Sequence, residues 1–140
     1  MKKLLTVMML LMSAIVSAEE VKNDIHILKI VDGDTYVISA PFIPKPLKQQ
    51  IPLRLKGVDT PNIKRFANCA KEAELGEQAK YFVESIWKNS KKENIKFVGM
   101  DKYNRIIGEV YFDDRSIADL LIANKLARPY TGGKKESWCH

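Results

Sequence analysis

The chain has 140 residues, enough for one domain, and a formal net charge of +6. A mild basic excess suits a polyanionic partner, but many exported proteins share it, so charge alone selects no function. Two isolated histidines and the lack of a Cys-x-x-Cys pair argue against a zinc site.

Residues 1–18 have the pattern of a secretory signal peptide. Lys2 and Lys3 precede an apolar run, residues 4–16, that is short for a bilayer span, and Val16-Ser17-Ala18 offers small residues for cleavage. A retained membrane anchor is the alternative. We expect cleavage, no membrane attachment afterwards, and export to a periplasm or out of the cell. The mature domain, residues 19–140, would keep 21 basic and 17 acidic residues, a charge of +4.

The domain begins with three expected strands. Residues 26–31 and 35–38 flank Asp32-Gly33, a dipeptide typical of tight turns because glycine accepts positive φ. Residues 40–52 contain four prolines and predict an exposed loop, since proline removes ladder donors. Residues 53–58 predict the third strand.

A helix is expected over residues 71–89, where apolar residues recur every three or four positions. They are Leu75, Ala79, Phe82, Val83, Ile86 and Trp87. Strands at 95–98 and 106–112 follow, then a short helix at 117–123 that Ser116 would cap. This order predicts a mainly β, α+β domain: a five-stranded OB-type barrel with two or three helices. Such barrels commonly bind nucleic acid or saccharides on one face.

Two short acidic motifs are candidates for a site. They are Asp32-Gly33-Asp34-Thr35 and Asp59-Thr60-Pro61, and Arg54 lies five residues before the second. Carboxylates on separate strands can meet around one hard cation, and an arginine beside them can hold a phosphate. Taken singly, each motif is also explained as an ordinary turn, strand residue or loop.

Cys69 and Cys139 are the two cysteines of the chain. In an exported protein such a pair favours one disulfide, which would tie the C-terminus to the body of the domain. Two free thiols are the alternative.

Four segments, in this order, resemble the staphylococcal nuclease family, also called thermonucleases. They are residues 31–35 (VDGDT), 54–61 (RLKGVDTP), 75–79 (LGEQA) and 101–105 (DKYNR). The resemblance extends from about residue 25 to residue 130. The C-terminal part, with Cys139 paired to Cys69, is similar to the exported, disulfide-bearing branch of the family.

The resemblance implies calcium-dependent hydrolysis of phosphodiester bonds in DNA or RNA, and we expect a monomer. Asp34, Asp59 and the backbone carbonyl of Thr60 would hold Ca²⁺. Arg54 and Arg105 would be the catalytic residues that bind the scissile phosphate, and Tyr103 would contact the nucleotide.

The main departure from the family is Asn62, because the family motif reads Asp-Thr-Pro-Glu and that glutamate is the proposed general base. An amide cannot take a proton from water, and a general base contributes roughly 10²–10⁴-fold. Another carboxylate could substitute, and the nearest are Glu72 and Glu74. The alternative is a weakened nuclease or an inactive nucleic-acid-binding OB module. A secreted structural domain would leave the metal and phosphate residues unexplained.

Three positions where relatives often carry glycine hold Asn104, Asp114 and Lys125 here. Asparagine and aspartate tolerate left-handed backbone best, so Asn124 could take that conformation in place of Lys125. The long third helix of the founding member is expected to be absent.

Overall fold

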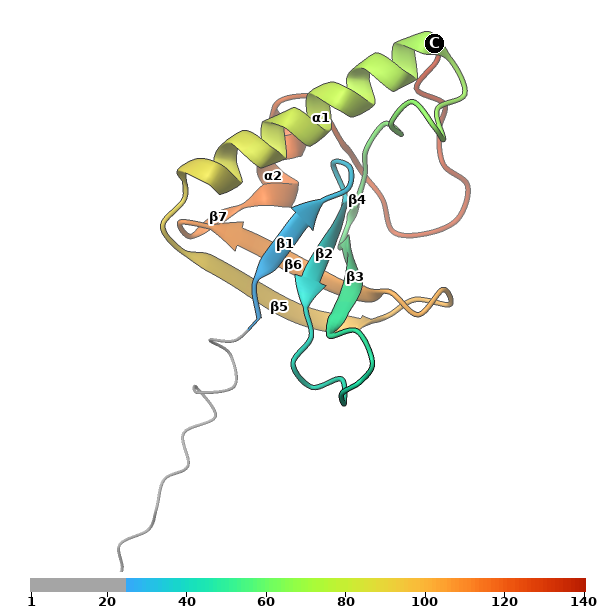
Figure 1. Ribbon diagram of the computed structural model, residues 1–140. Helices are drawn as coiled ribbons and strands as arrows, with labels where there is room; N and C mark the ends of the chain where they lie inside the picture. Colours follow the sequence, from blue (N-terminus) through green and yellow to red (C-terminus); the bar gives the residue numbers. More distant parts are fainter. Residues whose placement is uncertain (1–24) are drawn as a thin grey trace, which may run out of the picture.

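The computed structural model describes residues 25–140 (Figure 1). The predicted signal peptide, residues 1–18, lies outside this range and stays a prediction, as does the domain boundary at residue 19. No helix in the described range is both long enough and apolar enough to cross a membrane.

A mixed sheet forms the body of the domain. Its main strands, in the spatial order β1-β2-β3-β6-β5, are β1 (Ile27–Ile30), β2 (Thr35–Ser39), β3 (Gln50–Leu55), β6 (Ile106–Phe112) and β5 (Glu93–Met100). The neighbours are antiparallel except β3 and β6, which are parallel. Short strand β7 (Arg115–Ser116) pairs with β6, and β4 (Val58–Asp59) pairs with β8 (Arg128–Pro129) in a second, two-stranded sheet. The strands and two helices form the predicted OB-type α+β fold.

Helix α1 (Ala70–Asn89) crosses over the sheet, and α2 (Ile117–Ala123) lies below α1, next to β6 and β7 (Figure 1). The predicted apolar stripe of α1 faces the core, where Ala79 and Val83 are fully buried. The helix begins at an N-cap, Cys69, whose sulfur accepts a hydrogen bond from the Glu72 backbone N–H (3.4 Å). Glu72 of this first turn lines one cavity together with Asp59 and Thr60, so the turn lies beside the second acidic motif.

The third strand differs from the prediction at both ends. Strand β3 begins at Gln50 and includes Pro52, opposite Val37 of β2. Pairing with β6 starts only at Leu53, so the absent N–H of Pro52 removes no bond from that ladder. At the other end, Gly57 adopts φ +82° and turns the chain, so β4 is a separate strand.

The Asp32-Gly33 turn needs glycine for a reason other than the expected positive φ. Gly33 is absent from the positive-φ residues of the described range. A Cβ added to it would lie 2.9 Å from both the Ala79 Cβ and the side chain of Thr60. Glycine therefore allows the turn to pack directly against α1 and the second acidic motif.

Of the three positions where left-handed backbone was predicted, Asn104 (φ 61°) and Asp114 (φ 64°) adopt it as expected. At the end of α2, however, Lys125 itself is left-handed (φ 58°), while Asn124 has φ −92°. The backbone bonds Leu126 N–H to Leu121 O (2.9 Å) and Lys125 N–H to Ile122 O (3.0 Å) form a Schellman motif, which requires that conformation one residue after the cap.

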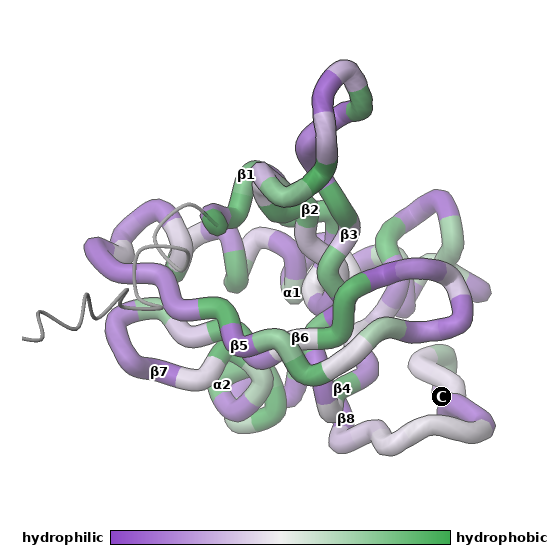
Figure 2. The backbone as a smooth tube through the Cα atoms, turned by 90° about the horizontal axis from the view of Figure 1, so that it is seen from below, coloured by the Kyte–Doolittle hydropathy of each residue, from purple (hydrophilic) through white to green (hydrophobic). Residues whose placement is uncertain are grey.

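The C-terminal segment, defined here as residues 131–140, follows β8 as a long loop without helix or strand. Figure 2 shows it as mainly neutral and hydrophilic chain. It returns to the first turn of α1, where Cys139 is bonded to Cys69 (Figure 1). The disulfide favoured by the sequence is therefore present, and no third helix is formed in the described residues.

Candidate active site

Strand register brings Asp34 and Arg54 together. Asp34 directly precedes β2, and its neighbour Thr35 is paired with Arg54 of β3. The Arg54 Nη1 atom lies 2.6 Å from Asp34 Oδ2, and Nη2 donates to the Val58 carbonyl (2.9 Å). Both side chains are about 90% buried, with 11% and 10% exposed, so this is an ion pair shielded from water.

The second acidic motif meets the first at Thr60. The Thr60 backbone N–H donates to Asp34 Oδ2 (3.0 Å), which places the Asp59–Thr60 backbone beside the Asp34 carboxylate. Asp34 and Asp59 are buried, with 7% and 6% of their surfaces exposed. The Thr60 hydroxyl oxygen is also buried, and it is the one buried side-chain polar atom of the described residues without a hydrogen-bond partner.

The Asp32 carboxyl is hydrogen-bonded and electrostatically linked to Asp34. Its Oδ1 accepts a hydrogen bond from the Asp34 backbone N–H (3.0 Å). Burial first, and the negative charge of Asp34 second, raise the pKa of Asp32 to about 7. The raised pKa of Asp32 therefore reflects its burial and its proximity to the Asp34 carboxylate.

The C-terminal segment contacts Asp59 with two side chains that the sequence analysis did not identify. Lys135 Nζ lies 3.2 Å from Asp59 Oδ1, and the Trp138 indole N–H donates to Asp59 Oδ2 (3.2 Å). Both oxygens of Asp59 thus face donors that lie more than 70 residues later in the chain. The signal that could have found them is the position of Trp138 beside Cys139, because a bond to Cys69 brings this end of the chain back to the second motif.

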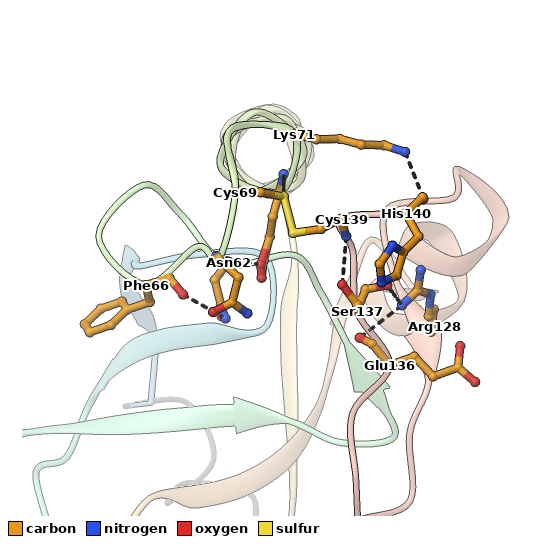
Figure 3. The surroundings of a disulfide bond; sticks show 11 residues. Asn62, Phe66, Cys69, Lys71, Arg128, Glu136, Ser137, Cys139 and His140 are labelled. Carbon is orange, nitrogen blue, oxygen red and sulfur yellow. Dashed lines mark hydrogen bonds between the residues drawn. A yellow bond between two sulfur atoms is a disulfide. The ribbon is translucent and has the colours of Figure 1, made fainter.

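Several further contacts hold the C-terminal segment in place (Figure 3). Lys71 Nζ donates to the His140 carbonyl (3.0 Å), and Arg128 Nη1 donates to the Ser137 carbonyl (2.9 Å). The Arg128 guanidinium also lies over the Trp138 ring, 3.8 Å from its centroid. The disulfide is therefore one of several contacts that keep the segment against the domain.

Arg105 and Tyr103 lie in the turn between β5 and β6. Arg105 Nε is 2.7 Å from Asp101 Oδ2, and the Arg105 guanidinium lies 5.5 Å from the Tyr103 ring centroid. Arg54 pairs with Ile107, two residues after Arg105, so both arginines belong to the same face of the sheet. From strand spacings their Cα atoms are roughly 8 Å apart. Within the described residues, no ion pair or hydrogen bond joins Arg105 or Tyr103 to Asp34 or Asp59.

Asn62 and Glu72 share a polar cavity with Asp59 and Thr60. The cavity measures about 630 Å³, and the C-terminal segment closes one side of it. Glu72 is buried, with 2% of its surface exposed. Glu74, the other carboxylate considered for the base, is exposed and lines a different hollow on the outside of α1.

The model of the staphylococcal nuclease homologues matches residues 52–137, more than half of the chain. The chain belongs to the staphylococcal nuclease family. A comparison with curated proteins found no match. Family membership indicates a nuclease-like or nucleic-acid-binding function, and nucleases of this family are generally calcium-dependent hydrolases.

The matched range begins after the first acidic motif, so the family match does not include Asp34. The position of Asp34 in the site comes from the structure. The structure brings Asp34 to Arg54 and Thr60, and it adds Lys135 and Trp138 at Asp59. The arrangement pairs one buried carboxylate, Asp34, with Arg54 and the other, Asp59, with Lys135.

Proposed function

We propose that this family member is a calcium-dependent nuclease that hydrolyses phosphodiester bonds of DNA or RNA. The observation that carries the proposal is the junction of Asp34, Arg54 and Thr60, with Asp59 beside it. It combines hard oxygen donors with a guanidinium that is shielded from water. Arg54 and Arg105 would bind the scissile phosphate from one face of the sheet, and Tyr103 would contact the nucleotide.

The residues fit a calcium ion by their chemistry. Asp34, Asp59 and the Thr60 carbonyl would hold it, since Ca²⁺ takes oxygen ligands in irregular geometry and accepts waters and phosphate oxygens as the rest. No cluster of three or more acidic, histidine or cysteine side chains suited to a metal occurs in the described part of the chain, so these other oxygens are needed. Asp34 and Asp59 are each paired with a cationic side chain, Arg54 and Lys135 respectively. This supports the binding of a cation at the two carboxylates. When bound, calcium would supply charge that offsets the negative phosphate.

The chain's own arginines have separate tasks in this proposal. Arg54 is held by Asp34 and by the Val58 carbonyl, so its direction is fixed before substrate arrives. Arg105 is held by Asp101 at the more exposed turn and could follow the nucleic acid backbone. Preorganised donors of this kind stabilise the charge that develops on the phosphorus oxygens.

One observation favours a second candidate, a nucleic-acid-binding module without cleavage. Asn62 occupies the place of the family's glutamate, and its amide Nδ2 faces the Phe66 carbonyl (3.4 Å). A side chain used in this way ties the loop together and accepts no proton.

One assay separates the two candidates. The purified protein is incubated with double-stranded DNA in calcium and, separately, in EGTA. Cleavage in calcium that is lost in EGTA and in Asp34→Ala supports the nuclease. Salt-sensitive DNA binding without any cleavage supports the binding module instead.

Export to a periplasm or beyond the cell is part of the same proposal. The signal-peptide pattern of residues 1–18 and the Cys69–Cys139 disulfide support it, because disulfides persist in oxidising compartments. Fractionation of producing cells, followed by N-terminal sequencing, tests it; an uncleaved chain in the cytoplasm would contradict it.

A further inference from the structure

At the position of the family's proposed general base, this chain has Asn62, whose side chain is hydrogen-bonded to the neighbouring loop. Figure 3 shows the Asn62 amide turned toward the Phe66 carbonyl, in agreement with the hydrogen bond between them. The Asn62 backbone is also fixed, because its carbonyl lies against Gly76 of α1, where a Cβ would come within 2.2 Å of it. Asn62 therefore neither accepts a proton nor moves aside easily.

Glu72 is the carboxylate of the first turn of α1 that reaches the same cavity. It shares the lining with Asp59 and Thr60, the two residues through which the cavity meets the proposed site. It is more deeply buried than either aspartate, at 2% exposure against 6% for Asp59 and 7% for Asp34. A buried carboxylate beside a polar cavity is a group that can face an attacking water.

The contacts of Glu72 leave its charge without a cationic partner. Its Oε2 accepts a long hydrogen bond, 3.4 Å, from the Asn68 backbone N–H. No ion pair reaches it among the residues that the structure describes, whereas Asp34 and Asp59 each have one. Burying an unpaired carboxylate is unfavourable, so a purely structural explanation accounts poorly for it.

The structural explanation is that Glu72 caps the helix. Cys69 is the N-cap, which puts Glu72 at the third helical position, where a glutamate commonly reaches back to the chain before the helix. Its bond goes instead to the N–H of Asn68, one residue before the N-cap, and at 3.4 Å it is a weak bond to one carboxylate oxygen. The two roles are compatible, and they predict different results for a glutamine at this position.

We propose that Glu72 is the proton acceptor of the nuclease reaction, in place of the glutamate that Asn62 replaces. This inference rests on the proposed function. As water attacks, a new P–O bond forms and the ester P–O bond breaks. The water proton passes to the Glu72 carboxylate, and the leaving oxygen takes a proton from solvent. Arg54 and Arg105 offset the charge on the phosphorus oxygens during this step.

The decisive variant is Glu72→Gln, which keeps the shape of the side chain and an acceptor for the Asn68 N–H. We expect the cleavage rate kcat to fall by about 10²–10⁴-fold, with the melting temperature and calcium affinity unchanged. Glu74→Gln is the matched control, since Glu74 is exposed on the same helix turn and outside the cavity. It should cleave at the rate of the unaltered protein.

The double variant Asn62→Glu/Glu72→Gln tests the role itself. A glutamate at the family's position should restore cleavage if Glu72 acts as a base, whereas a lost helix cap would not be repaired by it. If Glu72→Gln cleaves at the normal rate, the Glu72 proposal is wrong while the nuclease proposal stands. If the unaltered protein does not cleave, the nuclease proposal itself fails.

The single variant Asn62→Glu keeps the inference testable even if Glu72→Gln does not fold. Because the proposal gives the site an acceptor already, we expect this variant to change kcat by less than about tenfold. A gain of about 10²-fold or more would mean that the natural site lacks a base, and it would overturn the proposal.

Discussion

The two carboxylates proposed to hold the metal are supported by different parts of the molecule. Asp34 is held by Arg54 of the neighbouring strand β3 and by the backbone N–H of Thr60, which directly follows β4. Asp59 is held by Lys135 and Trp138 of the C-terminal segment, 76 and 79 positions later. One side of the site is therefore built into the fold. The other side depends on a loop that returns from the end of the chain and is fastened by a disulfide.

Because of this difference, Asp34 mainly stabilises the fold, whereas Asp59 is the carboxylate that an incoming cation can reach more easily. The Asp34–Arg54 pair is about 90% buried, so neither charge can move into water if its partner is lost. The Lys135 side chain is 49% exposed and can turn to solvent. A cation that binds Asp59 therefore has to displace a loosely held ammonium group and an indole N–H.

The largest expected effect distinguishes the two sides directly. Asp34→Ala leaves the Arg54 guanidinium buried without its carboxylate and should lower the free energy of unfolding by about 3–5 kcal/mol. Asp59→Ala leaves a half-exposed lysine and should lower it by about 1 kcal/mol or less. Urea denaturation of both variants measures the difference. Equal losses would show that the C-terminal segment is as integral to the fold as the strands.

Loss of the disulfide should have the next largest effect. Cys69 and Cys139 are 70 residues apart, and removing both in Cys69→Ser/Cys139→Ser should destabilise the protein by about 2–4 kcal/mol. The physical reason is the larger conformational freedom of the unfolded chain. Denaturation with and without a dithiol reductant measures it, and the double variant serves as the control that reductant should not affect. An unchanged midpoint after full reduction of the natural protein would contradict the expectation.

Removing the competing cation should strengthen calcium binding. Lys135→Gln deletes an ion pair between a half-exposed lysine and Asp59 worth about 1 kcal/mol, which corresponds to roughly fivefold tighter binding. Titration calorimetry with calcium alone measures the affinity. Lys134→Gln is the matched control, because Lys134 lines the same cavity but forms no ion pair with Asp59. Weaker binding in Lys135→Gln would show that the lysine assists the site.

The smallest expected effect concerns the turn that carries Arg105. Burial alone would raise the pKa of Asp101, but hydrogen bonds from Arg105 and the Tyr103 backbone N–H outweigh it and lower that pKa below its usual value. The ionised Asp101 carboxylate therefore stabilises the folded protein at pH values above the ordinary aspartate pKa. This contribution is lost as the pH falls through the lowered pKa of the folded state.

Asp101→Asn tests this contribution. We expect the variant to be less stable than the natural protein by about 0.5 kcal/mol near pH 6, with the gap closing toward pH 3. Thermal melts at the two pH values provide the measurement. A gap that widens in acid would mean that the carboxyl is stabilised in its protonated form, with the opposite sign of the pKa shift.

Local signals in the sequence were sufficient for most of the fold. The three- and four-residue spacing of Ala79, Val83 and their neighbours predicts α1 because that spacing places them on one face of a helix. The Asp-Gly turn between two apolar runs predicts the β1–β2 hairpin, although Gly33 serves close packing and not positive φ. Pro52 was predicted to lie in a loop, but it belongs to β3. A strand residue that is paired on one side only tolerates a missing N–H donor, and whether Pro52 is paired on its second side depends on where β6 begins.

By itself, the sequence determined the presence of the two helices and the five main strands, the family and the identity of the charged residues, since these follow from short-range spacing and motifs. Two cysteines also left one intramolecular pairing, which the structure contains. Only the tertiary structure decided which of Glu72 and Glu74 is buried against the cavity, and that Lys135 and Trp138 cover Asp59. Asp59 and its partners Lys135 and Trp138 are far apart in the chain, and Glu72 and Glu74 are only two positions apart yet differ in burial. Both outcomes depend on how α1 and the C-terminal segment pack, which no local sequence pattern encodes.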